Sequence, residues 1–296
     1  MNATNTFSLS PVVAGMWRMV EWDLPVKERL ALIEQCLELG ITSFDHADIY
    51  GDYQCEGLFG EALALKPAIR EQMEIISKCG IRLVSKNRPA HQYKTYDTSY
   101  AHIVASVDNS LKQLSTDYLD CILIHRPDPL MDAAEVARAF SDLKVAGKIR
   151  AAGVSNFVPH QLSLLQRYCD FPLAINQIEI SVLQTESFFD GSLDYCQEFG
   201  VIPMAWSPLA GGRLFSGENE QAVRVINQLT SIGQALGATD DQIAFAWLLR
   251  HPAKIKPIVG SGNIARIKSA VEATGITLSD EQWFSILEAS QGKAVP

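Results

Sequence analysis

The stretch Gly40-Ile-Thr-Ser-Phe-Asp45-His-Ala-Asp-Ile-Tyr50-Gly51 joins a short apolar run to an acid and a phenol. The apolar run, residues 41–44, is typical of a buried strand, so Asp45 should lie where the strand ends and Tyr50 in the loop beyond it. Burying a carboxylate there is costly unless a cation meets it. This unit, an apolar strand followed at once by a polar side chain, recurs along the chain and decides the fold.

Short apolar runs alternate with helical patterns along the whole chain. The runs that predict strands are 11–15, 41–44, 74–77, 119–124, 151–154, 173–175, 201–205 and 257–259. The patterns that predict helices are 24–39, 57–65, 101–114, 133–146, 160–168, 193–199, 222–236, 239–251, 264–273 and 279–292. Capping boxes open two of these helices, at Thr239-Asp-Asp-Gln242 and Ser279-Asp-Glu-Gln282. The strands are apolar throughout, as in a parallel sheet covered on both faces.

Strands and helices that alternate in this way over 296 residues favour a (β/α)8 TIM barrel with one extra C-terminal helix. A doubly wound open sheet is the alternative, and the count of eight strands depends on the first run. Polar residues that follow the strands favour the barrel, because a barrel gathers all its strand ends around one mouth. These residues are Asp45, Lys78, His125, Ser155, Asn156, Asn176, Gln177, Ser207 and Ser261.

The loops 80–99 and 211–221 are expected to stand over this mouth as substrate walls or lids. No linker, internal repeat or low-complexity tract divides the chain, so we expect residues 1–296 to form one domain.

The composition excludes several functional classes. The formal net charge is −9, from 34 acidic and 25 basic residues without a basic run, which argues against nucleic acid as a partner. No apolar stretch approaches the roughly 20 residues of a membrane helix, and residues 1–6 lack the pattern of a leader peptide. The six scattered cysteines are typical of reduced thiols. We therefore expect a cytoplasmic protein, without a membrane partner, that is a monomer or a small homo-oligomer.

Four of the strand-end residues have complementary chemistry. Tyrosine is a poor acid at its ordinary pKa of about 10, but a neighbouring ammonium group lowers this value. Lys78 is the candidate ammonium for Tyr50, and Asp45 would hold Lys78 charged. His125 could hydrogen-bond the oxygen of a bound carbonyl. Each residue alone is more often structural, but four complementary groups on successive strand ends indicate a catalytic site.

The motifs around these residues resemble the aldo-keto reductase superfamily over nearly the whole chain. They are Gly40–Gly51, Ile76-Ser-Lys78, Leu123-Ile-His-Arg-Pro127, Gly147–Phe157, Asn176-Gln-Ile-Glu179, Trp206-Ser-Pro-Leu209 and Gly260-Ser-Gly262 with Arg266. The resemblance implies a TIM barrel whose catalytic residues are Asp45, Tyr50, Lys78 and His125, with Tyr50 as the general acid in carbonyl reduction. It implies an NADP-dependent oxidoreductase of alcohol dehydrogenase or carbonyl reductase type, which reduces aldehydes or ketones with NADPH.

The same resemblance implies where the nicotinamide cofactor would bind. Ser155, Asn156 and Gln177 would hold the carboxamide, and Trp206, which stands where the family usually has tyrosine, would stack on the ring. The pyrophosphate would follow a glycine-containing segment. The residues of that segment are Ser207, Pro208, Leu209 and Gly211.

The run Gly260-Ser-Gly-Asn-Ile-Ala265 satisfies the GxGxxA dinucleotide fingerprint. Only about 30 residues follow it, which is too few for a Rossmann domain. In a barrel, the backbone amides at the start of the last barrel helix would instead bind a phosphate. The residues there are Gly260, Ser261 and Gly262. Arg266 would bind the 2′-phosphate and favour NADP over NAD. Gly260 stands where the family often has lysine, so use of both cofactors stays open.

Two residues depart from the family on the substrate side, namely His46 and Arg126. An interior Arg126 would suggest acidic substrates, and a solvated Arg126 is the alternative. We expect Trp17, Met19, Tyr53 and the loop 80–99 to form apolar walls for a small carbonyl substrate. Two rival functions remain: a nicotinamide-binding regulatory or sensor subunit, and a barrel hydrolase with a metal at His46, Asp48 and Asp52. The hydrolase is disfavoured because no further ligands follow at metal-binding spacing, so we predict no metal site.

Overall fold

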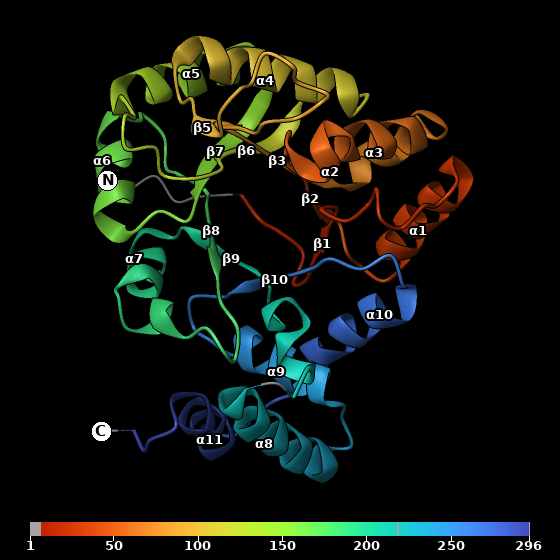
Figure 1. Ribbon diagram of the computed structural model, residues 1–296, viewed down its shortest axis with the longest axis vertical. Coiled ribbons are helices and arrows are strands. Elements are labelled where there is room, and N and C mark those ends of the chain that lie inside the picture. The colour runs from red at the N-terminus through yellow and green to blue at the C-terminus, as the bar shows by residue number, and fades with distance from the viewer. Residues whose placement is uncertain (1–6, 218, 296) are drawn as a thin grey trace.

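The computed structural model describes residues 7–217 and 219–295, and residues 1–6, for which the sequence predicts no leader peptide, lie outside the described residues. Eight parallel strands close into a barrel, in the order β1-β10-β9-β8-β7-β6-β3-β2 (Figure 1). The barrel strands are β1 (Val13–Gly15), β2 (Ser43–Asp45), β3 (Glu74–Cys79), β6 (Leu119–Ile124), β7 (Ile149–Ser155), β8 (Ile175–Glu179), β9 (Ile202–Trp206) and β10 (Lys256–Val259). The predicted (β/α)8 barrel is confirmed, and the open sheet is not formed.

Helices surround the barrel in a ring (Figure 1). They are α1 (Val26–Glu38), α2 (Tyr50–Tyr53), α3 (Cys55–Ala64), α4 (Tyr100–Gln113), α5 (Ala133–Val145), α6 (Pro159–Tyr168), α7 (Ser192–Phe199), α8 (Glu220–Leu236), α9 (Asp240–Leu249), α10 (Ile264–Glu272) and α11 (Asp280–Gln291). The extra C-terminal helix is α11, which lies beside α8. Both predicted capping boxes are present, at the starts of α9 and α11. None of the helices in the described ranges is both long and apolar enough to cross a lipid bilayer.

Strand register brings the functional strand ends to one level. Gly15 of β1 pairs with Asp45 of β2, and Ser155 of β7 pairs with Gln177 of β8. β1 also pairs with β10, so the first and last strands of the chain close the barrel together. All eight strands run parallel, and their carboxyl ends therefore open onto one mouth.

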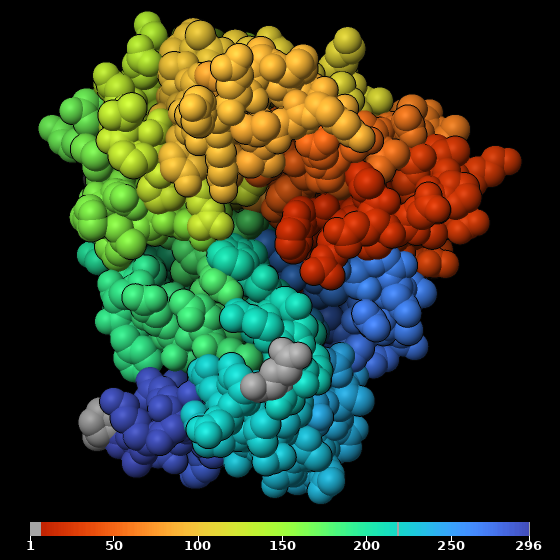
Figure 2. Space-filling view, in the orientation of Figure 1, coloured from red at the N-terminus to blue at the C-terminus, as the bar shows by residue number. Residues whose placement is uncertain are grey.

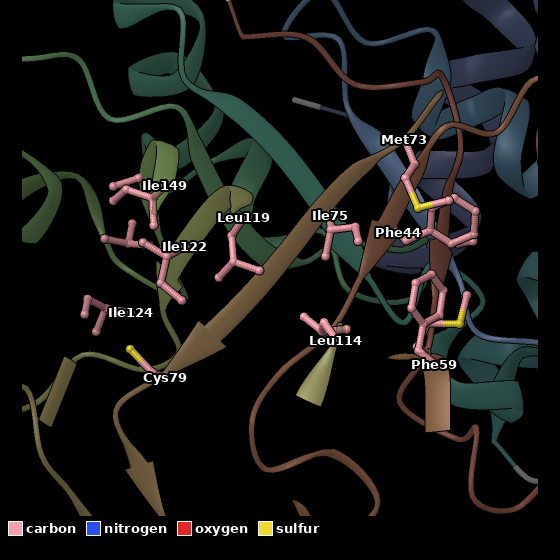
Figure 3. Packing of buried hydrophobic residues seen from close by; sticks show 14 of the residues in the cluster. Phe44, Phe59, Met73, Ile75, Cys79, Leu114, Leu119, Ile122, Ile124 and Ile149 are labelled. Atoms are coloured by element: carbon pink, nitrogen blue, oxygen red, sulfur yellow. The ribbon is translucent and has the colours of Figure 1, made fainter. Parts of the chain in front are cut away.

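The alternation of side chains along the strands decides which residues point into the barrel. Ile75 and Phe44 pack in the layer between strands and helices, beside Phe59 of α3 (Figure 3). Ile76 and Leu123 instead belong to the cluster inside the barrel. Successive residues of a strand point to opposite faces. Asp45, Lys78 and His125 therefore point into the barrel, on the same side as Ile76 and Leu123.

Apart from small shifts at the ends of elements, the structure differs from the sequence-based prediction in two segments. The strand predicted at 173–175 is wrong in its bounds, because β8 begins at Ile175 and includes Asn176 and Gln177. Both amides are tolerated within the strand because each is hydrogen-bonded, Gln177 to Asp45 and Asn176 to the backbone carbonyl of Phe157. The loop 80–99 contains a small antiparallel hairpin, β4 (Ile81–Arg82) with β5 (Thr95–Tyr96). Tyr50 begins the four-residue segment α2, in which Gly51, Asp52 and Tyr53 all have positive φ angles, so it lies in an irregular turn beyond β2, in agreement with the predicted loop.

At Gly153, the strand β7 lies so close to Ile175 of β8 that a side chain would not fit, and this can be tested by mutation. A Cβ atom at this position would lie 2.5 Å from the carbonyl oxygen of Ile175 and 2.9 Å from its nitrogen. We expect Gly153→Ala to lower the free energy of unfolding by about 1–3 kcal/mol, because backbone atoms cannot move aside as a side chain can. Gly275→Ala is the control, since no atom lies within 4 Å of its Cβ position. Urea unfolding that gives equal stability for both variants would contradict the prediction.

Candidate active site

Asp45, Lys78 and Tyr50 form one buried cluster at the carboxyl end of the barrel. The Lys78 ammonium lies 2.8 Å from Oδ1 of Asp45 and 2.9 Å from the hydroxyl oxygen of Tyr50. It also donates to the backbone carbonyl of His46 at 2.6 Å. An ammonium group has three N–H donors, and these three acceptors satisfy all of them. The predicted meeting of the acid, the lysine and the phenol is therefore present.

The hydrogen bond from Lys78 decides what the Tyr50 hydroxyl can do. Because its oxygen accepts from Lys78, its own proton is available to donate elsewhere. Within the cluster the only oxygen in reach is Oδ2 of Asp45, at a long 3.5 Å. Tyr50 lines the cavity described below, so a ligand oxygen in that cavity would be the better acceptor.

The expected acidification of Tyr50 is wrong for the protein without ligands. Burial and the negative charge of Asp45 raise the pKa of Tyr50 well above its ordinary value. Burial also lowers the pKa of Lys78, and Asp45 opposes this shift. The sequence-based argument considered the effect of the ammonium on Tyr50, and it left out both the loss of water and the effect of the negative charge of Asp45 on the phenol. The phenol is therefore held protonated, which is the state that a proton donor needs.

His125 stands beside the phenol. Its ring centroid lies 5.9 Å from that of Tyr50, edge to face, and the side chain lines the cavity. Burial and the positive charges of Lys78, Arg126 and Lys94 lower the pKa of His125 well below its ordinary value. A neutral imidazole retains one N–H, which can donate to an oxygen bound next to Tyr50.

A cavity of about 1340 Å³ opens above this cluster. It is larger than the 300–1,000 Å³ usual for pockets of drug-sized ligands, as an extended dinucleotide together with a substrate would require. In the space-filling view the molecule is hollowed near its centre, where N-terminal, central and C-terminal segments meet (Figure 2). The cavity is lined by Asp45, Tyr50, His125, Ser155, Asn156, Gln177, Trp206, Ser207, Pro208, Leu209, Gly211, Gly260, Ser261 and Arg266.

Two residues of the predicted site do not line this cavity. Lys78 is fully buried, and it is linked to the cavity through the lining residues Tyr50 and Asp45. Gly262 lies against Trp22, and a Cβ at Gly262 would come within 2.7 Å of that indole. The indole of Trp22 leaves no room for a side chain at Gly262, and the contact of its backbone with a phosphate stays a prediction.

The residues expected to hold a carboxamide form a connected polar network. Trp206 Nε1 donates to Oδ1 of Asn156 at 2.9 Å, and Nδ2 of Asn156 donates to Oγ of Ser155 at 2.8 Å. The Ser155 hydroxyl donates to the backbone carbonyl of Gln177. The sequence missed one contact of this network, since Nε2 of Gln177 donates to Oδ1 of Asp45 at 2.7 Å. The network fixes the Trp206 ring and ties it to the acid of the cluster.

The segment after β9 has the backbone of an anion site. Ser207, Ala210, Gly211 and Gly212 all have positive φ angles, between 50° and 94°. Successive residues of this kind can turn their amides towards a common anion. No atom of residues 7–217 or 219–295 lies within 4 Å of the Cβ positions of Gly211 and Gly212, so the backbone is open to a ligand on the side of these described residues. These features fit a pyrophosphate along this side of the cavity.

Beneath the cluster lie three further titratable groups that the sequence did not place. Burial raises the pKa of Glu56 to about 7 and that of Asp48 well above its ordinary value. Burial and the charge of Lys78 lower the pKa of His46 to about 3, and both of its ring nitrogens lack a hydrogen-bond partner among the described residues. His46 packs edge-on against Phe59. Within the described ranges, no group of three or more His, Cys, Asp and Glu side chains is arranged to hold a metal ion.

The sequence-based list of the site was incomplete in one region and wrong in another. The start of α9 also lines the cavity, through Thr239, Asp240, Asp241 and Phe245. The capping box at Thr239 was the available signal, because it marked a helix start at the carboxyl end of the barrel. Met19 is buried in the core, and neither it nor Tyr53 lines the cavity, so two of the predicted substrate walls are wrong.

Comparison with known proteins agrees with the barrel fold. The sequence pattern of the Aldo/keto reductase family matches residues 11–291. The uncharacterized oxidoreductase YcsN of Bacillus subtilis is 51% identical over 288 residues, which cover 97% of this chain and 96% of that protein. The 6-dehydroglucose reductase of Agrobacterium fabrum is 44% identical over 293 residues, which cover 99% and 98% of the two chains.

A solved structure gives the same result. The thermostable aldo-keto reductase Tm1743, in complex with the inhibitor epalrestat, superposes with a TM-score of 0.82 at 28% identity. The superposition covers 97% of this chain and 98% of the other. The resemblance that the motifs indicated is confirmed from both sequence and structure, and this chain belongs to the aldo/keto reductase family of oxidoreductases.

Proposed function

We propose that this protein reduces aldehyde or ketone carbonyls to alcohols with NADPH. The observation that carries the proposal is that Tyr50 lines the cavity while its hydroxyl oxygen accepts a hydrogen bond from Lys78 at 2.9 Å. Enzymes of this family use a nicotinamide cofactor, which supplies the hydride when it is bound. We also propose that the chain works as one domain, because its first and last strands close the barrel together.

The residues of the cluster would transfer the proton and orient the substrate. Tyr50 donates its proton to the carbonyl oxygen as negative charge develops there. The Lys78 ammonium stabilises the phenolate that is left, and Asp45 with Gln177 holds Lys78 in place. The neutral His125 donates a hydrogen bond to the same carbonyl oxygen and orients it. Ser155, Asn156 and Trp206 would hold the nicotinamide end of the cofactor through the network described above.

An oxidised sugar is the first substrate to test. Relatives named 6-dehydroglucose reductase, from Agrobacterium fabrum and Novosphingobium aromaticivorans, are 44% and 38% identical to this chain over nearly its full length. In this proposal the aldehyde group of the sugar would lie between Tyr50 and His125. Polar residues at the cavity rim, such as Asp52 and Lys94, would face its hydroxyl groups.

The direct test follows the loss of reduced-nicotinamide absorbance in purified protein. NADPH and NADH are each paired with 6-dehydroglucose, aromatic aldehydes, diketones and aldoses. Multiple turnovers with any of these carbonyls support the reductase. Tight binding of NADPH without turnover on any carbonyl would favour the regulatory or sensor subunit in its place, and no binding of either cofactor would overturn the proposal.

The preference for NADPH is expected to depend on Arg266. Its side chain is exposed, lines the cavity and forms no ion pair with the described residues. Asp241 of α9 accepts a hydrogen bond from Ser269, which lies in α10 together with Arg266. Its negative charge opposes the attraction of Arg266 for a phosphate. We expect Arg266→Ala to weaken NADPH binding by about 10–100-fold, the value of a charge-assisted contact, and to leave NADH binding within about twofold. Titration of the intrinsic tryptophan fluorescence measures both dissociation constants.

Lys268→Ala is the matched control, because it removes one positive charge from the same helix at a residue outside the cavity. An equal loss of NADPH and NADH binding in Arg266→Ala would show that Arg266 does not recognise the 2′-phosphate.

A further inference from the structure

Two positive side chains face the carbonyl end of the cavity without an acidic partner. Arg126 follows His125 directly, is half-buried, and holds its guanidinium 5.6 Å from the centre of the Trp206 ring. Lys94 lies just before β5 and also lines the cavity. Within the described ranges neither forms an ion pair, whereas the cavity-lining Arg18 lies 3.9 Å from Glu21.

The charges of these two residues act on the catalytic groups. Both Arg126 and Lys94 lower the pKa of His125, and Arg126 opposes the rise in the pKa of Tyr50. Their positive potential therefore extends to the place where a carbonyl oxygen would bind. A half-buried arginine without a counter-ion is costly to keep desolvated, and an anionic ligand would remove this cost.

The barrel topology separates Arg126 from the expected phosphate site of the cofactor. In the closed order of strands, β6 and β10 lie four positions apart on a ring of eight, which places them across the mouth from each other. Arg126 follows β6, whereas Gly260, Ser261 and Arg266 follow β10. Arg126 is thus in a position to contact the substrate, whereas Arg266 is in a position to contact the phosphate of the cofactor.

We infer that the preferred substrates carry a carboxylate, which Arg126 binds with Lys94 close by while the carbonyl group lies between Tyr50 and His125. This inference rests on the proposed reductase function and adds the class of substrate. The neighbouring lining residues Trp17, Ile81 and Tyr96 offer apolar and aromatic surface to the body of such a molecule. A guanidinium held over an indole can bind a carboxylate through two parallel hydrogen bonds.

The test compares aldehydes that differ only in charge. The pairs are 3-formylbenzoate and 4-formylbenzoate, each against its methyl ester, and D-glucuronate against D-glucose. With the wild-type protein, we expect kcat/KM for the acid to exceed that for its neutral partner by about tenfold or more, mainly through KM. The advantage should shrink as sodium chloride is raised, because salt screens the attraction.

Arg126→Gln is expected to bring this ratio close to one, and Arg126→Lys, which keeps the positive charge without the planar guanidinium, should restore part of the preference. Arg138→Gln is the matched control, since Arg138 also stacks over an aromatic ring, that of Tyr100, but does not line the cavity. A ratio near one in the wild-type protein, or an equal ratio in Arg126→Gln and the wild type, would overturn the inference.

A binding measurement separates failure of this inference from failure of the reductase function. Isothermal titration of the protein with bound NADPH measures the affinities for benzoate and benzamide. Tighter binding of benzoate that disappears in Arg126→Gln supports the carboxylate site even if no aldehyde is reduced. Equal binding of the two ligands overturns the site even if neutral aldehydes are reduced rapidly.

Discussion

Tyr50→Phe is expected to lower kcat for carbonyl reduction by about 10²–10⁴-fold, the usual contribution of a positioned general acid. The substitution keeps the aromatic ring that packs edge to face against His125, and it removes only the hydroxyl. No other proton donor at this end of the cavity accepts a hydrogen bond from Lys78. Steady-state turnover with saturating cofactor measures the loss. Fluorescence titration should give an unchanged dissociation constant for NADPH, because the phenol is expected to act on the substrate.

Tyr53→Phe controls for the loss of a tyrosine hydroxyl as such. The oxygen of Tyr53 accepts a hydrogen bond from the backbone nitrogen of Leu83 at 2.8 Å, and Tyr53 does not line the cavity. We expect a small loss of stability in this variant and kcat within about threefold of the wild type, since only one ordinary hydrogen bond is removed. Turnover in Tyr50→Phe that stays within the same range would remove Tyr50 from the proposed mechanism.

The fold could be predicted closely because its signals are local. The capping boxes and the apolar runs each depend on a few neighbouring residues. The β8 bounds could not be predicted in the same way. Asn176 and Gln177 are polar in sequence, and only their partners elsewhere in the chain, Phe157 and Asp45, make them suitable for a strand interior.

The contacts among three residues of the candidate site were predicted correctly, but the direction of the pKa shift of Tyr50 was not. Asp45, Tyr50 and Lys78 meet as expected, because the parity and register of the strands follow from their sequence pattern. The pKa of Tyr50 was predicted in the wrong direction, since burial is a property of the whole assembled mouth. The contact between Gln177 and Asp45, which are 132 residues apart in the chain, carries no local sequence signal at all.

Removing one charge of the buried pair between Asp45 and Lys78 should destabilise the protein strongly. Lys78 is fully buried and Asp45 is 2% exposed, so either single substitution leaves a charge without its partner or water. We expect Asp45→Asn and Lys78→Met each to lower the free energy of unfolding by about 3–5 kcal/mol. Asparagine is chosen because its side-chain oxygen can still accept from Gln177. Unfolding in guanidinium chloride measures the change.

The double variant, Asp45→Asn with Lys78→Met, separates stability from catalysis. It removes both charges, so it should be more stable than the sum of the single losses predicts, by about 1–3 kcal/mol. It should remain inactive, because the phenolate of Tyr50 would form without the ammonium that stabilises it. Neutralising one member of the exposed pair of Lys148 and Asp108 should change stability by no more than about 1 kcal/mol. Additive losses in the double variant would show that the buried charges are not coupled, and turnover in it would show that Tyr50 does not need Lys78.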